Sequence, residues 1–161
     1  MIVAGGRGER AGGGVAKQYR PLAGRPVLAW TIGAFKGADF IQTVIGPADS
    51  EAFAHAASGL NLLAPTIGGP NRQESVRLGL EALTAHAPEF VLIHDAARPL
   101  ASPALIARVT DALKSGAQAV VPVLPVTDAL KRMEGDGLAA VSRDGLYRAQ
   151  TPQGFRFDAI L

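Results

Sequence analysis

The sequence predicts an α/β fold, a doubly wound, mostly parallel sheet with a protruding β-hairpin arm. Short apolar segments alternate with amphipathic segments of helical spacing as far as residue 124. Residues 90–93 are apolar without alternation, as in a strand that is buried on both faces. Beyond Pro125 the segments become short, polar and charged. Because the chain has 161 residues, we expect one domain over residues 1–161, with residues 126–149 as the arm.

The elements before the arm follow from apolar spacing and from residues that begin or end helices. Asn71, with Glu74 three residues later as a capping-box partner, begins one helix. Ser102 caps another, with Pro103 as its first residue. The expected strands are 1–3, 40–45, 60–67, 90–93 and 119–124. The expected helices are 27–35, 47–57, one from Asn71 to Leu83, and one from Pro103 that ends at Gly116.

The arm is expected to be a hairpin. Residues 128–133 and 138–142 are its strands, and Glu134 to Gly137 form the turn between them. Residues 151–155 are expected to turn the chain toward a short final helix. Since the arm has few apolar residues of its own, a second subunit is a candidate to cover it, and we expect a homodimer through the arm.

Composition excludes several classes of protein. The formal net charge is +2, and the cationic residues form no long run, which argues against a nucleic acid polymer as partner. The sequence has no cysteine, so disulfides and thiolate chemistry are excluded. No apolar run approaches the length of a membrane span. We expect a cytoplasmic protein without a membrane partner.

Residues 4–17 form a glycine-rich loop after the first strand, with Arg10 and Lys17 as cations within it and at its end. Six of its fourteen residues are glycine. Backbone N–H groups in such a loop can approach an anion closely, so the loop is a candidate phosphate cradle; a plain connector is the alternative. Residues 6–11 resemble a dinucleotide-binding fingerprint, but the three glycines at 12–14 would break the helix that should follow.

Other polar residues follow predicted strands and should meet the loop at one edge of the sheet. Asp95 ends the apolar run 90–93, where a carboxylate can hold a divalent cation beside a phosphate. Arg98 can bind a second anion, or pair with a surface acid. Arg72 and Ser75 lie in the first turn of a helix, where N–H groups favour anions; ordinary capping is the alternative.

The combined motifs resemble one enzyme family. They are Ala4 to Arg10 with Lys17-Gln18-Tyr19, Gly68-Gly69 with Arg72 and Ser75, His94-Asp95-Ala96-Ala97-Arg98-Pro99, Pro125 to Lys131, and Thr151-Pro152-Gln153. In this order and over the whole chain they are similar to 2-C-methyl-D-erythritol 4-phosphate cytidylyltransferases. The resemblance implies a Rossmann-like nucleotidyltransferase fold. It also implies transfer of CMP from CTP to methylerythritol phosphate in non-mevalonate isoprenoid synthesis.

The resemblance also implies roles for individual residues. Arg10 and Lys17 would be catalytic, because they would stabilise the charge of the transition state and of the leaving pyrophosphate. Asp95 would hold Mg²⁺. The implied nucleotide-binding residues are Ala4, Gly5, Gly6, Gly8, Gly69, Arg72, Ser75, Asp95 and Ala96, and the implied acceptor-binding residues are Arg98, Thr127, Arg143 and Thr151, with Arg143 reaching across a dimer.

The sequence departs from the family pattern at three places. Ala16 stands where the family usually has proline, and Ala129 where it has a substrate-contacting threonine. Later family motifs are missing, so we expect that the C-terminal part of the domain is absent from this sequence. Either the chain is a fragment, for example of a bifunctional protein with a fused cyclodiphosphate synthase domain, or its site is incomplete. Three other functions remain open: a ribitol-5-phosphate cytidylyltransferase, a non-catalytic nucleotide-binding or dimerisation module, and a dinucleotide-dependent oxidoreductase.

Overall fold

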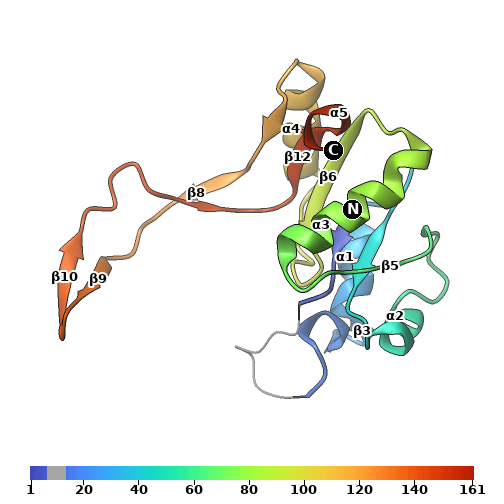
Figure 1. The fold of residues 1–161 in the computed structure, drawn as a ribbon, viewed down its shortest axis with the longest axis horizontal. Helices are drawn as coiled ribbons and strands as arrows, with labels where there is room; N and C mark the ends of the chain where they lie inside the picture. The colour runs from blue at the N-terminus through green and yellow to red at the C-terminus, as the bar shows by residue number, and fades with distance from the viewer. Residues whose placement is uncertain (7–13) are drawn as a thin grey trace.

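The computed structural model describes residues 1–6 and 14–161. A six-stranded sheet has the order β5-β4-β1-β6-β12-β7 (Figure 1). Its strands are β1 (Ile2–Val3), β4 (Thr43–Ile45), β5 (Thr66–Ile67), β6 (Phe90–Asp95), β7 (Ala119–Val120) and β12 (Gln153–Arg156). The α-helices are α1 (Val27–Ala34), α2 (Ser50–Ala56), α3 (Arg72–Leu83), α4 (Pro103–Lys114) and α5 (Phe157–Ile160). Short 3₁₀ helices η2 (Lys17–Tyr19) and η3 (Thr84–His86) and a small hairpin of β2 (Pro21–Leu22) and β3 (Arg25–Pro26) complete the body.

The predicted helix starts are confirmed at α3 and α4. The Asn71 side chain accepts a hydrogen bond of 2.8 Å from the Glu74 amide, and the Ser102 hydroxyl accepts one of 3.2 Å from the Leu105 amide. Each cap satisfies an amide that has no partner inside its helix. The Glu74 carboxylate is engaged with Arg77, so the second half of the predicted capping box is replaced by an ion pair along the helix.

The parallel register brings several strand ends to one edge of the sheet. Val3 of β1 lies opposite Val44 of β4 and Asp95 of β6, and Ile45 lies opposite Ile67 of β5. The chain runs from β1 to β4 and β5 on one side and then crosses to β6 on the other. The gap between β1 and β6 is therefore the topological switch point, where open α/β sheets bind ligands beyond the strand ends.

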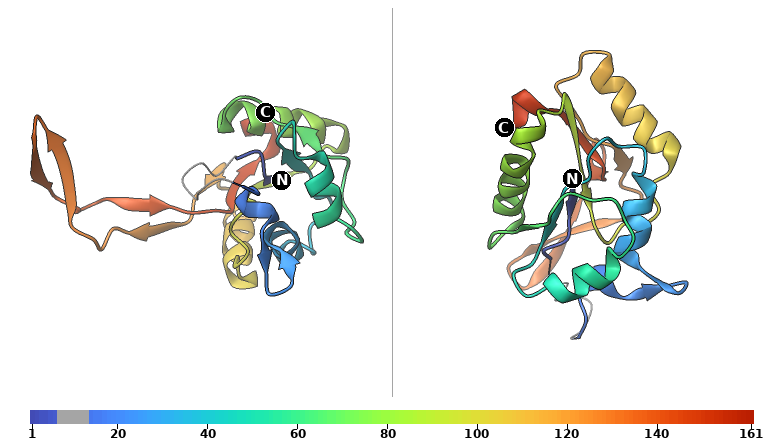
Figure 2. Two further views of the ribbon diagram at one scale, coloured as in Figure 1. Left: turned by 90° about the horizontal axis from the view of Figure 1, so that it is seen from below. Right: turned by 90° about the vertical axis from the view of Figure 1, so that its right-hand side faces the viewer.

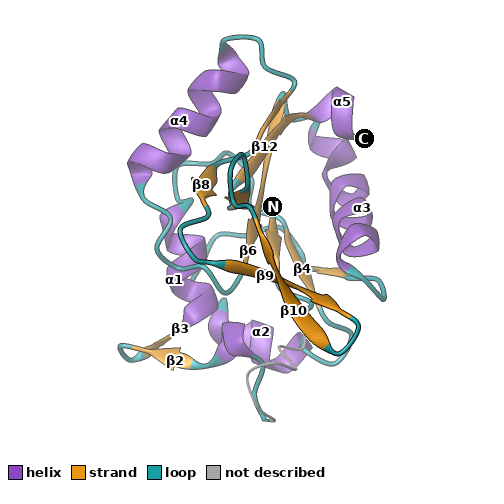
Figure 3. Ribbon diagram, turned by 90° about the vertical axis from the view of Figure 1, so that its left-hand side faces the viewer, coloured by secondary structure: helices purple, strands orange, loops and turns teal. Residues whose placement is uncertain are grey.

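Helices cover both faces of the sheet, which confirms the doubly wound architecture (Figures 2 and 3). One buried cluster joins α1 and α2 to the sheet through Leu28, Ile32 and Phe53, with Ile106 of α4 packed against it. The other face is packed by Leu80 and Leu83 of α3, together with Phe157 of α5. Leu92 of β6 packs in the cluster with α1 and α2, whereas Val91 and Ile93 pack in the cluster with α3 and α5. Strand β6 is therefore buried on both faces, as its apolar sequence predicts.

The expectation that residues 151–155 form only a turn is wrong. Gln153–Arg156 is strand β12, which is inserted between β6 and β7 and pairs antiparallel with both. Its sequence includes a glycine and two polar residues, so it has little intrinsic strand preference. It is a strand because two neighbours, distant in the sequence, supply hydrogen bonds on either side.

The predicted strand 40–45 is reduced to β4 (Thr43–Ile45). Two further predicted strands are shorter than expected because each contains a proline, which cannot donate a backbone hydrogen bond. Of residues 60–67, only β5 is a strand, and Pro65 directly precedes it. The predicted strand 119–124 is interrupted at Pro122. Residues 119–120 stay in the main sheet as β7, and residues 123–125 leave it as β8.

The arm extends away from the body, as predicted (Figure 1). Its base is a pair of antiparallel strands, β8 (Val123–Pro125) and β11 (Tyr147–Ala149), and its tip is the hairpin of β9 (Leu130–Glu134) and β10 (Gly137–Val141). Its exposed large apolar side chains are Val123, Leu124, Met133, Leu138, Leu146 and Tyr147. Among the helices that the structure describes, none is long and apolar enough to cross a bilayer.

Gly154 tests the packing of β12 beneath α4. A β-carbon at this position would lie 2.5 Å from Val109 Cγ1 and 2.9 Å from Leu113 Cδ1. Gly154→Ala should therefore lower the free energy of unfolding by about 1–3 kcal/mol, measured by urea denaturation. As a control, Gly33→Ala in α1 adds a methyl group to open space and should raise it by about 0.5–1 kcal/mol. An unchanged stability of the Gly154 variant would contradict the close packing.

Candidate nucleotide and phosphate site

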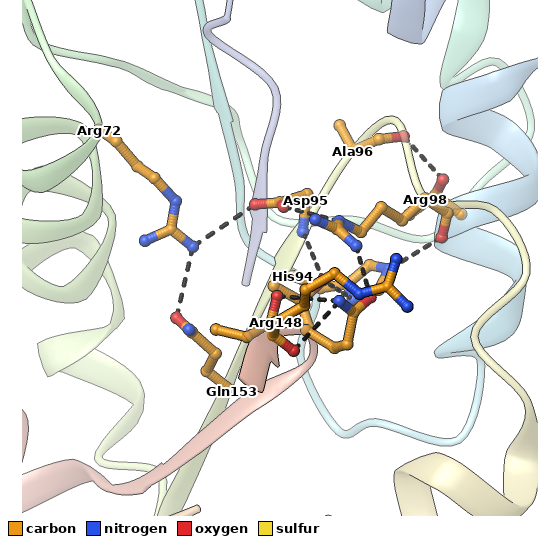
Figure 4. Close-up of polar contacts among 11 residues, drawn as sticks. Arg72, His94, Asp95, Ala96, Arg98, Arg148 and Gln153 are labelled. Carbon is orange, nitrogen blue, oxygen red and sulfur yellow. Dashed lines mark hydrogen bonds and ion pairs between the residues drawn. The ribbon is translucent and has the colours of Figure 1, made fainter. Parts of the chain in front are cut away.

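Asp95 lies at the centre of the candidate site, at the end of β6 and beside the end of β1. Its carboxylate accepts a hydrogen bond of 2.9 Å from Arg98 Nε, and Arg72 Nη2 lies 3.4 Å from its other oxygen. Arg72 is the first residue of α3, and Arg98 belongs to the turn after β6. Figure 4 shows the two guanidinium groups approaching Asp95 from opposite sides. All three side chains are partly exposed, so the cluster is open to a ligand.

The same two arginines are also held by the segment that returns from the arm. Arg98 Nη1 donates to Gln150 Oε1 at 2.9 Å, and Arg72 Nη2 lies 3.5 Å from Gln153 Oε1 (Figure 4). Each guanidinium is thus shared between a carboxylate and a neutral amide oxygen. Two full positive charges face one negative charge, which leaves the cluster suited to an additional anion.

Buried polar groups hold the turn that carries Asp95 and Arg98. Thr31 of α1 is fully buried, and its hydroxyl donates to the Ala96 carbonyl at 2.7 Å. His94 is also buried, and its two ring nitrogens contact Thr151 Oγ1 and the Arg98 carbonyl oxygen, each at 2.9 Å. Burial lowers the pKa of His94, which favours the neutral imidazole. His94 is therefore a packed residue at the end of β6.

The described ends of the glycine-rich loop are tied together by Gln18. This residue is buried in η2, and its side-chain amide donates to the carbonyl oxygens of Ala4 and Gly6. Ala4 is also held by its own amide, which donates to the Val44 carbonyl at 2.7 Å. Lys17, the residue before Gln18, is exposed. The buried side chain of Gln18 therefore fixes the position of Lys17 in the chain relative to the end of β1.

The loop before α3 approaches the helix too closely for a side chain. A β-carbon on Gly69 would lie 2.2 Å from Glu74 Cγ, so glycine is required there. The hydroxyl of Ser75 is turned toward this loop and donates to the Asn71 carbonyl at 2.8 Å. Ser75 is itself buried, and its role in nucleotide binding stays a prediction.

The structure brings most of the predicted site residues to one edge of the sheet. These are Ala4, Gly5, Gly6, Lys17, Gly69, Arg72, Ser75, Asp95, Ala96, Arg98 and Thr151. Gly8 and Arg10 lie outside the described residues. Thr127 and Arg143 lie elsewhere, on the exposed arm, where the Arg143 guanidinium donates to the Thr127 carbonyl. Figure 1 shows that the tip of this arm, β9 and β10, extends away from the body that contains β6.

Sequence reasoning gave no role to four residues that shape the site. Gln150 and Gln153 hold the two arginines, Thr31 holds the turn, and Gln18 joins the loop ends. Thr31 had a usable signal, because it is the one hydroxyl residue in the otherwise apolar helix sequence of α1. The two glutamines flank Thr151 and Pro152, but only the unexpected strand β12 places them beside the arginines.

A groove of about 830 Å³ lies at the opposite edge of the sheet, where β1 and β6 begin. Its lining is largely apolar and includes Phe35, Phe90 and Ile106. Its lining residue Phe35 also packs against His94, with ring centroids 4.8 Å apart. Among the described residues there is no cluster of three or more side chains of the types that bind metals.

Comparison with known proteins assigns these features to a family. Residues 1–161 match the family described as 2-C-methyl-D-erythritol 4-phosphate cytidylyltransferase (IspD). The chain is 51% identical over 166 residues to a bifunctional enzyme IspD/IspF of Rhodospirillum rubrum, covering 100% of this chain and 43% of that protein. It is 51% identical over 168 residues to a 2-C-methyl-D-erythritol 4-phosphate cytidylyltransferase of Cereibacter sphaeroides, covering 100% of this chain and 73% of that one.

Solved structures of the same family have a similar fold. The crystal structure of 2-C-methyl-D-erythritol 4-phosphate cytidylyltransferase from Thermus thermophilus superposes with a TM-score of 0.79 at 35% identity, over 98% of this chain and 70% of that one. The chain thus spans less than half the length of the bifunctional relative and about 70% of the structural one.

Proposed function

Because the chain belongs to the 2-C-methyl-D-erythritol 4-phosphate cytidylyltransferase family, we propose that it transfers CMP from CTP to methylerythritol phosphate. The observation that carries the proposal is the cluster at the switch point of the sheet. There the described ends of the glycine-rich loop, residues 4–6 and 14–17, lie beside the ends of β1 and β6, where Arg72, Asp95 and Arg98 form one cluster. Backbone amides and cations gathered there suit a triphosphate and a second phosphate.

In the proposed reaction a phosphate oxygen of the acceptor attacks the α-phosphorus of CTP. A new P–O bond forms, the bond from the α-phosphorus to the bridging oxygen breaks, and pyrophosphate takes the electron pair. Side chains need do little covalent work in such a transfer, because positioning and fixed positive charge lower the barrier. Lys17 and Arg10 are the proposed source of that charge, and Arg98 and Thr151 lie on the proposed acceptor side.

Asp95 fits a role in holding Mg²⁺ with the nucleotide. Its carboxylate is the acidic group at the centre of the cluster, and its side chain is partly exposed. Magnesium in such sites is bound by one or two carboxylates together with substrate phosphates, so a larger cluster of protein ligands is not needed. When bound, the ion would neutralise charge on the phosphates. Arg72 and Arg98 would then be free to contact the substrates' remaining negative charges.

The arm supports a proposal that the protein is a homodimer. Its apolar side chains Leu124, Leu138 and Tyr147 are exposed in one chain, and a partner would cover them. Arg143 lies on this arm and outside its own chain's Asp95 cluster. We propose that it completes the acceptor site of the partner. A cytoplasmic location stays a prediction.

The direct test is pyrophosphate release from CTP and Mg²⁺, with methylerythritol phosphate or ribitol 5-phosphate as acceptor. We expect release with methylerythritol phosphate. Release with ribitol 5-phosphate alone would contradict the proposed acceptor. Binding of CTP without release with either acceptor would indicate a nucleotide-binding module instead. Saturable binding of NAD(H) or NADP(H) in place of CTP would support an oxidoreductase.

Lys17→Ala should lower kcat by at least about a hundredfold, because it removes a full charge that stabilises the transition state. The fold should be retained, since Lys17 is exposed and its neighbour Gln18 makes the buried contacts. The matched control is Lys36→Ala, an exposed lysine on the lining of the opposite groove, which should keep the wild-type rate. A normal kcat in the Lys17 variant would remove its assigned role.

Arg143→Ala should raise the KM for methylerythritol phosphate about tenfold or more and leave the KM for CTP nearly unchanged. The reason is that a charge-assisted hydrogen bond to the acceptor alone is lost. Arg132→Ala is the control, because Arg132 is an exposed arginine on the same arm. Steady-state kinetics with each substrate varied in turn gives both constants. An equal rise in the two KM values would argue against an acceptor contact.

A further inference from the structure

His94 joins two segments that meet at the candidate site. It is the residue before Asp95 on β6, and 1% of it is exposed to solvent. Its Nδ1 lies 2.9 Å from Thr151 Oγ1, at the point where the arm returns to the body. Its Nε2 lies 2.9 Å from the carbonyl oxygen of Arg98, in the turn after β6. The ring packs against Phe35, with centroids 4.8 Å apart.

The partners of the ring define its tautomer. The Arg98 carbonyl can only accept, so Nε2 must carry the proton and donate it there. Nδ1 is then left with a lone pair, which accepts from the Thr151 hydroxyl. The Thr151 oxygen in turn lies 3.4 Å from the Asp95 amide, which donates to it. Three hydrogen bonds therefore run in one direction, from the Asp95 amide to the Arg98 carbonyl.

This chain of hydrogen bonds closes the turn from Asp95 to Arg98 against the segment 150–151. The Arg98 guanidinium depends on both parts, since it donates to Asp95 Oδ2 and to Gln150 Oε1, each at 2.9 Å. A shift of Thr151 would carry Gln150 with it and loosen one of those bonds. The Thr151 hydroxyl donates to the buried ring of His94, and only 8% of Thr151 is exposed to solvent.

We infer that His94 is a positioning residue for the transfer reaction: through Thr151 and the Arg98 backbone it fixes the Arg98 guanidinium for the anionic acceptor. It has no contact with the acceptor. The Thr151 hydroxyl links the ring of His94 to the segment that holds Arg98. This inference rests on the proposed function for the identity of the acceptor.

Two substitutions separate the two bonds of the ring. His94→Gln keeps a donor near Nε2 and loses the acceptor for Thr151, whereas His94→Asn keeps an acceptor near Nδ1 and loses the donor to Arg98. Thr151→Val removes the hydroxyl at the same volume, and Thr151→Ser retains it. His55→Gln is the control, because His55 is an exposed residue of α2, away from the site.

We expect His94→Gln, His94→Asn and Thr151→Val each to raise the KM for methylerythritol phosphate about tenfold, the effect of one lost hydrogen bond. The KM for CTP should change less than about twofold. His55→Gln should resemble the wild type, and Thr151→Ser, which retains the hydroxyl, should recover most of the loss seen with Thr151→Val. The double variant of His94→Gln and Thr151→Val should be no worse than either single variant, since both remove the same bond.

Two kinetic results would overturn the inference. An additive, roughly hundredfold loss in the double variant would mean that the two side chains act independently and not through their shared hydrogen bond. A lower melting temperature with an unchanged KM for methylerythritol phosphate in all single variants would mean that the ring only stabilises the fold.

A spectroscopic measurement separates this inference from the proposed function. Long-range ¹H–¹⁵N NMR of the wild-type chain reports which ring nitrogen of His94 is protonated. We expect a protonated Nε2 and an unprotonated Nδ1. The opposite tautomer would overturn the inference whether or not the chain turns over methylerythritol phosphate. A wild-type chain without turnover but with the expected tautomer would contradict the proposed function alone.

Discussion

The parallel pairing of β1 with β4 and β6 is the constraint on which the site depends. It sets Val3 opposite Asp95, so the end of the first strand and the end of the central strand meet. Each strand is followed by a segment that cannot continue the sheet, a glycine-rich loop after β1 and the Asp95–Arg98 turn after β6. A shift of one residue in this register would turn the side chains of β6 to opposite faces and separate His94 from its present partner Thr151.

Charge at this edge is arranged around Asp95. The carboxylate holds Arg72 and Arg98 near each other although the two guanidinium groups repel. The side-chain amide oxygen of Gln150 also accepts from Arg98, and that of Gln153 lies near Arg72. The buried side chains beneath the cluster, Thr31 and His94, hold the turn that carries Asp95 and Arg98 through hydrogen bonds to its backbone.

The sequence predicts those parts of the fold that depend on local patterns. The apolar run 90–93 predicts the central strand and places Asp95 at its end, and Asn71 and Ser102 predict the starts of α3 and α4. Strand β12 is not predictable in this way, because its pairing depends on β6 and β7, which are distant in the sequence. The contacts of Thr151 with His94, and of Gln150 with Arg98, depend on the position of that strand, so they cannot be predicted from local patterns either. Family motifs mark some of these residues but give no contacts for them.

The central claim is that the carboxyl edge of the sheet, between β1 and β6, is the nucleotide site. A crystal structure of the chain grown with CTP and Mg²⁺ tests it most directly. The account predicts that the triphosphate lies between residues 4–6 and the turn that contains Asp95 and Arg98, with the metal ion beside Asp95. CTP bound at the opposite edge, in the groove lined by Phe35 and Phe90, would contradict it.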